Sequence, residues 1–302
     1  MQDDAAYPLV FDVRGFSLDD GPGIRTTVFL KGCPLSCVWC HNPESWKTEK
    51  EVAFYPRLCV GCGDCVRSCP ESAASMDLPG RIHRDQCTAC GACVDACPST
   101  ALKAVGAHYD ADELVTLLLD NRVFYEISGG GVTFSGGEPT LHMDYLRRVM
   151  RRLKQQGVHI AVQTSGMFEL REFREKVLPF ADLIYYDIKF LDSGLHEKYT
   201  GAGNERILEN FRALRKEAAV ELVPRTPLVP GITAEEKNVD AIARFVKAEG
   251  CERYELLPYN PGGIGKRTAI GKTGGHGLPS GMMGVEEESA WKSFAQDRFV
   301  KK

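Results

Sequence analysis

No stretch of the sequence reaches 18 consecutive apolar residues, so it contains no candidate for a membrane-spanning helix. Basic residues are also absent from its opening segment, MQDDAAYPLV, where a secretory signal peptide would need them. Positive charge is not in excess, because 37 Lys and Arg against 41 Asp and Glu give a net charge of −4, which disfavours nucleic acid binding. We therefore expect a globular protein of the cytoplasm with no membrane or nucleic acid partner.

Cysteine, in contrast, is abundant, with 12 residues in a chain of 302. Without a secretory signal the compartment is reducing, and clustered cysteines there bind metals more often than they form disulfides. All but one fall into three groups, which span residues 33–40, 59–69 and 87–97. The remaining one, Cys251, is expected to be a small buried hydrophobic residue.

The second and third groups form an internal repeat with the spacing C-x2-C-x2-C-x3-C-P. Its candidate ligands are Cys59, Cys62, Cys65, Cys69, Cys87, Cys90, Cys93 and Cys97. This is the spacing of bacterial two-cluster ferredoxins, in which three cysteines of a run hold one [4Fe–4S] cluster and the fourth ligates the other cluster. A pair of zinc sites is the alternative, but zinc would be satisfied by four tetrahedral ligands without the proline that ends each run. The repeat therefore predicts a ferredoxin-like module with two [4Fe–4S] clusters.

Outside this module, patterns typical of strands and helices alternate along the chain. Strands are expected at residues 26–31, 132–135, 159–163, 183–189, 219–225 and 254–259, and helices at residues 111–125, 144–156, 169–177, 204–216 and 235–249. Repeated βα units predict a parallel sheet with right-handed crossovers, and so an α/β protein built as an open or closed barrel.

The cysteine module interrupts this barrel after its first strand, which divides the chain into four segments. Residues 1–51 form the start of the barrel and 52–103 the two-cluster insert, and residues 104–260 complete the barrel. Residues 261–302 form a glycine-rich tail with a closing helix at 285–296. We expect residues 262–284 to be a loose connector, the alternative being a lid over the site.

The first cysteine group, Cys33-x3-Cys37-x2-Cys40, has three thiols and no fourth cysteine nearby. Three thiolates on a four-iron cube leave one iron without a protein ligand, and an open coordination position is what a catalytic metal site needs. Two alternatives remain at this point. His41 could complete a zinc site, or an unseen ligand could complete a third electron-transfer cluster.

Three further strings accompany this loop: SLDDGPGIRTTVFLKGC at residues 17–33, SGGGVTFSGGEP at 128–139 and YYDIK at 185–189. With Trp39 before the last cysteine and the two-cluster insert, the sequence resembles the activating enzymes of glycyl radical enzymes. These are members of the radical S-adenosylmethionine (SAM) superfamily, similar to the pyruvate formate-lyase activating enzyme. The resemblance implies a partial parallel (β/α) barrel, three [4Fe–4S] clusters and SAM. It also implies cleavage of SAM to a 5′-deoxyadenosyl radical, which takes a hydrogen atom from a glycine of a partner glycyl radical enzyme.

The same resemblance implies the residues of the site. Cys33, Cys37 and Cys40 would hold the catalytic cluster. SAM would be bound by Trp39, Ser135, Gly136, Gly137, Glu138, Thr164, Asp187, Lys189, Arg225 and Asn260. Asp20 lies in the loop that the family uses to dock the partner's glycyl segment. Two positions depart from the family pattern: Gln163 replaces an acidic residue, which leaves a cation or carboxylate contact open, and Asn260 replaces a histidine at the ribose.

Two other functions fit part of the sequence. A multi-cluster electron-transfer protein would explain the insert but leaves SGGGVTFSGGEP and YYDIK without a purpose. A radical SAM enzyme acting on a small molecule would leave the DGPGIR string without a purpose. For an activating enzyme, a ferredoxin or flavodoxin is the expected reductant. The sequence does not indicate which glycyl radical enzyme is the partner.

Overall fold

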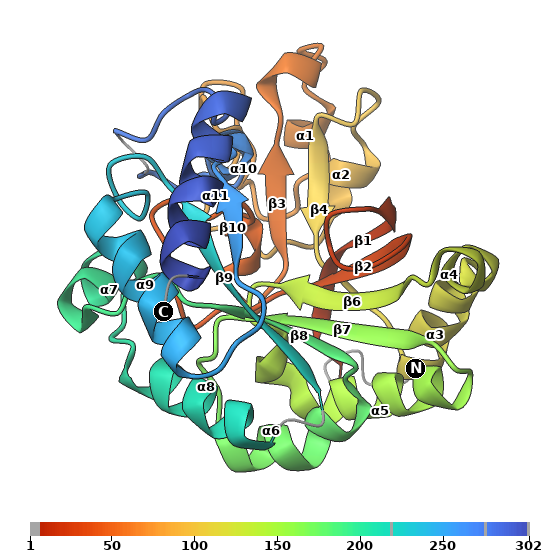
Figure 1. Ribbon diagram of the computed structural model, residues 1–302. Helices are drawn as coiled ribbons and strands as arrows, with labels where there is room; N and C mark the ends of the chain where they lie inside the picture. The colour runs from red at the N-terminus through yellow and green to blue at the C-terminus, as the bar shows by residue number, and fades with distance from the viewer. Residues whose placement is uncertain (1–6, 218–219, 275–276, 301–302) are drawn as a thin grey trace.

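The computed structural model describes residues 7–217, 220–274 and 277–300, and its main feature is a curved sheet of 8 strands (Figure 1). The parallel strands are β2 (Arg25–Leu30), β6 (Gly131–Gly136), β7 (His159–Thr164), β8 (Leu183–Asp187), β9 (Glu221–Leu228) and β10 (Glu255–Pro258). Beyond β2 the sheet continues with the antiparallel strands β1 (Leu9–Ser17) and β5 (Ala107–His108). The strand order is β10-β9-β8-β7-β6-β2-β1-β5, which confirms an α/β fold with a partial parallel barrel.

Helices cover the outer face of this sheet (Figure 1). They are α3 (Ala111–Leu119), α4 (Arg122–Ser128), α5 (Met143–Gln155), α6 (Leu170–Lys176), α7 (Ser193–Thr200), α8 (Glu205–Glu217) and α9 (Glu236–Ala248). Two more follow the last strand, α10 (Gly262–Ala269) and α11 (Val285–Val300), and α11 packs against α9. Short 3-10 turns are η2 (Pro43–Ser45), η3 (Pro56–Leu58), η4 (Pro139–His142) and η5 (Leu178–Phe180). None of the helices described is long and apolar enough to span a membrane.

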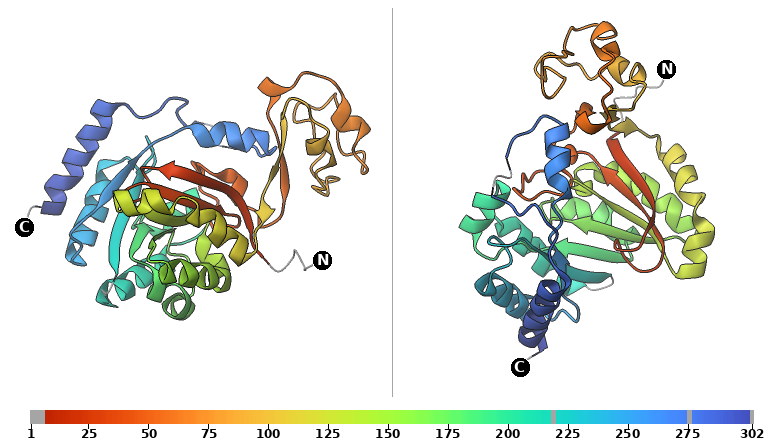
Figure 2. Two further views of the ribbon diagram at one scale, coloured as in Figure 1. Left: turned by 90° about the vertical axis from the view of Figure 1, so that its right-hand side faces the viewer. Right: turned by 90° about the horizontal axis from the view of Figure 1, so that it is seen from above.

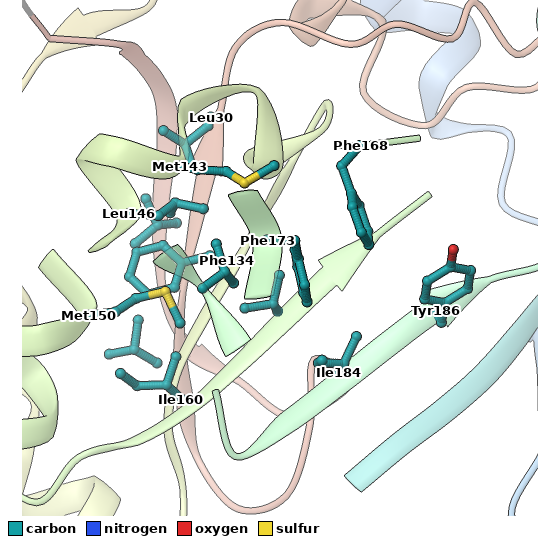
Figure 3. Packing of buried hydrophobic residues seen from close by; sticks show 14 of the residues in the cluster. Leu30, Phe134, Met143, Leu146, Met150, Ile160, Phe168, Phe173, Ile184 and Tyr186 are labelled. Carbon is teal, nitrogen blue, oxygen red and sulfur yellow. The ribbon is translucent and has the colours of Figure 1, made fainter. Parts of the chain in front are cut away.

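The main core lies between the sheet and these helices (Figure 3). Helix α5 shows why the sequence folds this way, since Leu146, Val149, Met150 and Leu153 recur at the helical period and are fully buried. The strands supply the other side, and β2 is buried along its whole length. A strand covered on both faces reads as a continuous hydrophobic run, which is why these strands could be predicted from the sequence.

The insert forms a separate small unit that projects from the barrel (Figure 2). Its base is a two-stranded antiparallel ribbon of β3 (Glu51–Phe54) and β4 (Leu102–Val105). Beyond the ribbon, each cysteine run leads into one turn of helix, α1 (Asp64–Arg67) and α2 (Ala92–Asp95). Before each turn, a glycine takes a left-handed backbone conformation that other residues rarely adopt, with φ of 76° at Gly63 and 91° at Gly91.

The sequence prediction lacks β3, β4, β5 and α7, and three further differences have a clear physical reason. Strand β1 was not predicted, because Asp12, Arg14 and two register shifts interrupt its hydrophobic alternation. The helix expected at 111–125 breaks into α3 and α4 around Asp120 and Asn121, residue types that favour helix ends over helix interiors. The expectation of a loose connector is wrong for residues 262–269, which form α10.

Candidate active site

A cavity of about 300 Å³ opens where the parallel strands end. It brings together predicted site residues from the cysteine loop and from strands β6 to β10. They are Cys33, Cys37, Trp39, Cys40, Ser135, Gly136, Gly137, Thr164, Asp187, Lys189, Arg225 and Asn260. Glu138 and Asp20 do not line the cavity, although both are bonded to residues that do.

The three thiols of the loop after β2 face this cavity from a largely buried position. Burial raises the pKa of Cys37 to about 12 and also raises the pKa of Cys33 and Cys40. These thiols therefore need a strongly positive group beside them before they become thiolates, and the iron of a cluster is such a group. Among the described residues, no group of three or more His, Cys, Asp or Glu side chains is arranged to hold a single metal ion.

The loop Ser135–Pro139 closes one side of the cavity against the cysteine loop. The N–H of Gly137 donates to the carbonyl oxygen of Leu30 at 2.9 Å, and the N–H of Glu138 donates to that of Gly32 at 2.7 Å. A side chain at position 137 would overlap the Gly32 carbonyl and approach the Cβ of Cys33 to 3.0 Å. Glycine at 137 is therefore what allows this loop to lie directly on the cysteine loop.

Glu138 is fully buried, and its carboxylate links the segments at the ends of β6 and β7 through hydrogen bonds. Its Oε1 accepts hydrogen bonds from the hydroxyls of Thr140 at 2.7 Å and Thr164 at 2.8 Å. Its Oε2 accepts from the N–H and the hydroxyl of Ser165, at 2.7 and 2.6 Å. These bonds position the loops around the cavity, and the contact of Glu138 with SAM that the resemblance implies stays a prediction.

Asp187 lies between two buried cations on the cavity wall. Its carboxylate accepts from Arg225 at 3.1 Å and from Lys189 at 3.3 Å. Burial alone would raise the pKa of Asp187, but Lys189 and Arg225 outweigh it and leave that pKa below its ordinary value. The pKa of Lys189 is raised because Asp187 and Cys37 outweigh the effect of burial. The site thus carries two positive charges against one carboxylate, which favours an anionic group of a ligand.

The carboxylate of Asp20 is hydrogen-bonded to residues of β2 and β7. It accepts from the hydroxyl of Thr27 at 2.8 Å and from the amide of Gln163 at 2.9 Å. Gln163 in turn accepts from the hydroxyl of Ser135 at 2.7 Å. The position where the family has an acidic residue is therefore occupied by an amide, and Asp20 supplies a carboxylate next to it. Its role in docking a partner segment stays a prediction.

Two further predicted residues, Trp39 and Asn260, also line the cavity. Trp39 packs edge-on against Phe190, with ring centroids 6.2 Å apart. Asn260 is exposed, and its side-chain oxygen accepts from the N–H of Gly262 at 2.9 Å, which leaves its amide nitrogen free to donate.

Sequence reasoning missed the contribution of α10, which lies on the cysteine loop. Any side chain at Gly263 would overlap the carbonyl oxygen of Cys40, so the helix and the loop are in direct contact there. Arg267, also buried, donates to the carbonyl oxygen of Val38 at 2.8 Å. No motif marks this helix, and its glycines point to a flexible segment instead. The signal that could have drawn attention to this helix was the pair of cations Lys266 and Arg267, which stand between its glycine residues and Gly271.

In the insert, the fourth cysteine of the first run lies beside the second run. Burial, Cys87 and Cys69 together raise the pKa of Cys93 to about 11, and Cys69 packs against the same cluster of side chains as Cys93. The exchange of ligands between runs, which the spacing predicts, would need this proximity and stays a prediction. Arg84 connects the insert to α10, since it donates to the carbonyl oxygen of Ala269 at 3.1 Å.

Comparison with known proteins shows the family of this chain. Residues 86–242, just over half of the chain, match the radical SAM superfamily, and residues 51–98 match the 4Fe-4S dicluster domain. The chain is 41% identical to the isethionate sulfite-lyase activating enzyme of Desulfovibrio desulfuricans, over 89% of this chain and 88% of the relative. It is 40% identical to the benzylsuccinate synthase activating enzyme of Thauera aromatica, over 94% of this chain and 87% of the relative.

A solved structure supports the fold. The radical SAM methyltransferase from Sphaerobacter thermophilus aligns with a TM-score of 0.52 at 16% identity, covering 97% of this chain and 75% of that chain. At this identity the likeness concerns the fold alone, whereas the two relatives share both sequence and length with this chain. The chain belongs to the radical SAM superfamily and, within it, to the activating enzymes of glycyl radical enzymes.

Proposed function

We propose that this chain takes a hydrogen atom from a glycine of a partner glycyl radical enzyme, using a [4Fe–4S] cluster on Cys33, Cys37 and Cys40 and SAM bound in the adjoining cavity. The observation that carries the proposal is that the three thiols open onto the same cavity as Ser135–Gly137, Asp187 and Lys189. Three protein ligands leave one iron for SAM. When bound, the cluster supplies an electron and SAM supplies the 5′-deoxyadenosyl radical that removes the hydrogen atom.

The two cations of the cavity have different parts in binding SAM. Arg225 is held by two bonds to Asp187 and lies 4.4 Å from the ring centroid of Tyr185, so it is fixed in place. Lys189 has a single long bond to Asp187, at 3.3 Å, and is freer to turn toward a ligand. We assign Lys189 to the carboxylate of SAM, with Arg225 keeping Asp187 in position.

The glycine loop and the cavity entrance bind the remaining parts of SAM. Gly136 and Gly137 bring backbone close to the amino group of SAM, with Ser135 beside them. Thr164 shares Glu138 with this loop and so fixes its position. At the entrance, Asn260 donates to the ribose and Trp39 packs beside the adenine. These assignments rest on the resemblance and on the position of each residue in the cavity wall.

The insert holds two further [4Fe–4S] clusters in this proposal, which makes three in the chain. One is bound by Cys59, Cys62, Cys65 and Cys97, the other by Cys87, Cys90, Cys93 and Cys69. Cys62 and Cys90 are exposed, so electrons can enter at the insert surface from a ferredoxin or flavodoxin. A cluster with an open iron is sensitive to oxygen, so the setting we propose is an anaerobic cytoplasm.

The partner is proposed only as a class. The two relatives reported above are named for activating different enzymes, an isethionate sulfite-lyase and a benzylsuccinate synthase, and they are 41% and 40% identical to this chain. That difference is too small to select one of them. A large protein with a glycine loop near its C-terminus, encoded in the neighbouring open reading frame, is the candidate partner to use in experiments.

The test is anaerobic turnover with a chemical reductant. The reconstituted protein should contain ~12 irons per chain, as three clusters require, and convert SAM to 5′-deoxyadenosine. Replacing Cys33, Cys37 and Cys40 with alanine should leave ~8 irons and abolish turnover. The control Cys251→Ala, at a buried residue of the main core, should change neither. A fully loaded protein that never cleaves SAM would instead favour an electron-transfer protein.

A further inference from the structure

Arg81 lies in the turn between the two cysteine runs of the insert, and its guanidinium contacts a thiol of the first run. Its Nη2 donates to the sulfur of Cys59 at 3.7 Å. Its Nη1 donates to the carbonyl oxygen of Ser75 at 3.2 Å and to the sulfur of Met76 at 3.0 Å. No role assigned above uses this side chain.

Two further features hold Arg81 in this position. Its guanidinium lies 5.2 Å from the ring centroid of Phe54, which is a cation–π distance. Its backbone takes a left-handed conformation with φ of 62°, which is uncommon for arginine, and a bridge between Ala74 and Ile82 closes the turn around it. A strained conformation of this kind persists where the surrounding structure fixes it, and such positions cluster at functional sites.

The charge of Arg81 and one of its donors are left without a partner in the chain. In the part of the chain that the structure describes, its hydrogen bonds go to a carbonyl oxygen and two sulfurs, and none goes to a carboxylate. Its Nε is shielded from solvent and has no acceptor among these residues. Buried donors are rarely left unpaired unless a bound group supplies the acceptor. A [4Fe–4S] cluster on the first run fits, since its thiolates and sulfides are acceptors and bring negative charge.

The second run differs at the matching position. Cys87, its first cysteine, accepts from the backbone N–H of Ala89 at 3.4 Å, which is a neutral donor. Arg84 precedes this run, but its guanidinium donates to the carbonyl oxygens of Val52 and Ala269. Among the described residues, a charged donor therefore contacts the first cysteine of the first run but not that of the second.

We propose that Arg81 donates a charge-assisted hydrogen bond to Cys59 when that cysteine ligates a cluster, and thereby raises the reduction potential of the first-run cluster. One-electron reduction adds negative charge to the cluster, and a cation with an N–H at a ligating sulfur stabilises that charge. Cys62 of the same run is exposed, so the tuned cluster is one that an external electron donor can reach. The inference rests on the part of the proposed function in which the insert holds clusters, and it does not depend on SAM.

The test is a redox titration of the full chain with Cys33, Cys37 and Cys40 replaced by alanine. In this triple-alanine chain the insert clusters alone give the electron paramagnetic resonance (EPR) signal of reduced clusters. Adding Arg81→Gln should shift one of the two reduction steps. At a fixed potential, its ratio of reduced to oxidised cluster should fall by roughly three- to tenfold, tenfold being about 59 mV for one electron. The other step should stay where it was.

The matched control is Arg67→Gln, which removes another arginine of the first run. Arg67 donates to the carbonyl oxygen of Cys62 and pairs with Asp64, so both reduction steps should stay unchanged. Arg81→Lys keeps the charge but loses the planar fork, and it should restore part of the ratio. Two unshifted steps in Arg81→Gln, or an equal shift in Arg67→Gln, overturn the role of Arg81.

A second measurement keeps Arg81 in place, so it holds even if Arg81→Gln binds iron poorly. In the triple-alanine chain, arginine labelled with ¹⁵N in the guanidinium should give a ¹⁵N hyperfine coupling to a reduced insert cluster. The coupling should persist in Arg67→Lys and Arg84→Lys. Its absence, or its loss in either variant with the clusters loaded, overturns the role of Arg81.

Failure of the proposed function is distinguishable from failure of this inference. A triple-alanine chain without its ~8 irons would show that the insert holds no pair of clusters. A wild-type chain that never cleaves SAM would refute the radical chemistry. Both results are obtained before any variant of Arg81 is made, whereas a loaded chain with no shift and no coupling refutes the role of Arg81 alone.

Discussion

The carboxylate of Glu138 accepts two hydrogen bonds from one residue, the N–H of Ser165 at 2.7 Å and its hydroxyl at 2.6 Å. The two residues follow the ends of the neighbouring strands β6 and β7, so this contact sets how far apart the segments after the two strands lie. The glycine loop that precedes Glu138 is thereby held against the cysteine loop. The shape of the cavity thus depends on a residue outside its wall.

We expect Glu138→Gln to lower the free energy of unfolding by about 2–4 kcal/mol, because an amide places a donor where the surrounding groups are themselves donors. The KM for SAM should rise as the loops separate. Anaerobic urea denaturation and SAM turnover measure the two effects. The matched control is Glu126→Gln, an exposed residue that pairs with Arg122, which should change stability by about 0.5 kcal/mol or less. Equal effects of the two variants would contradict the structural role of Glu138.

Helix α10 offers a paired test of its contact with the cysteine loop. At Gly263 a methyl group would overlap the carbonyl oxygen of Cys40, whereas at Gly265 it would meet nothing within 4 Å. Gly263→Ala should therefore displace the helix, cost about 1–3 kcal/mol and speed the loss of iron from the site to a chelator. Gly265→Ala should be neutral or stabilise by up to about 1 kcal/mol, as alanine favours a helix. If both variants release iron at the wild-type rate, α10 does not support the loop.

The ligand exchange in the insert predicts which cluster each cysteine serves. Cys69 belongs to the first run but lies near Cys93 of the second, so Cys69→Ser should damage the cluster held by the second run. We expect iron to fall from ~12 to ~8 per chain in that variant, with the first run's cluster still present. Iron analysis together with Mössbauer spectra checks this. Loss of the cluster on Cys59, Cys62 and Cys65 in its place would show that no exchange occurs.

Stability should also depend on pH through His196, which is almost fully buried in α7. Burial lowers the pKa of His196 more than its bond to the carbonyl oxygen of Ala202 raises it. The unfolded chain therefore takes up a proton below its ordinary pKa of about 6.5, while the folded chain resists it. Stability should be complete above that pH and fall below it by up to about 1.4 kcal/mol per pH unit.

His196→Asn should flatten this slope by up to one proton, because asparagine can still donate to Ala202 but does not titrate. His83→Asn, at an exposed position in the insert, should keep the slope. Urea denaturation between pH 5 and 8, under argon, measures both. A slope that is the same in His196→Asn as in wild type would assign the pH dependence to other groups.

Much of the fold could be predicted because the strands that form the barrel are buried on both faces. Strands β2, β6 and β7 begin and end within a residue or two of the predicted ranges, since their hydrophobic runs are continuous. Strand β1 could not be recognised, because it lies near the edge of the sheet and carries Asp12 and Arg14. Helix α10 could not be recognised either, because its contact with the cysteine loop, not its glycine-rich sequence, stabilises it.

The residues of the site, like the elements of the fold, could be predicted from the sequence only in part. The cysteine spacing and the glycine loop are local patterns, so their chemistry is visible in the sequence. Contacts between distant segments are not, and the bonds of Glu138 to Ser165, of Asp20 to Gln163 and of Arg267 to Val38 appear only after folding. Each of these bonds joins residues that no motif links, so sequence reasoning could name the ligand contacts but not the residues that position them.

The central claim is that a hydrogen atom passes from a glycine of the partner to the 5′-deoxyadenosyl group. It is tested most directly by preparing the partner encoded in the neighbouring reading frame with Cα-deuterated glycine and treating it with the reduced holoenzyme and SAM. We predict 5′-deoxyadenosine carrying one deuterium, together with the EPR signal of a glycyl radical on the partner. Formation of 5′-deoxyadenosine without deuterium, and without that signal, would contradict the account.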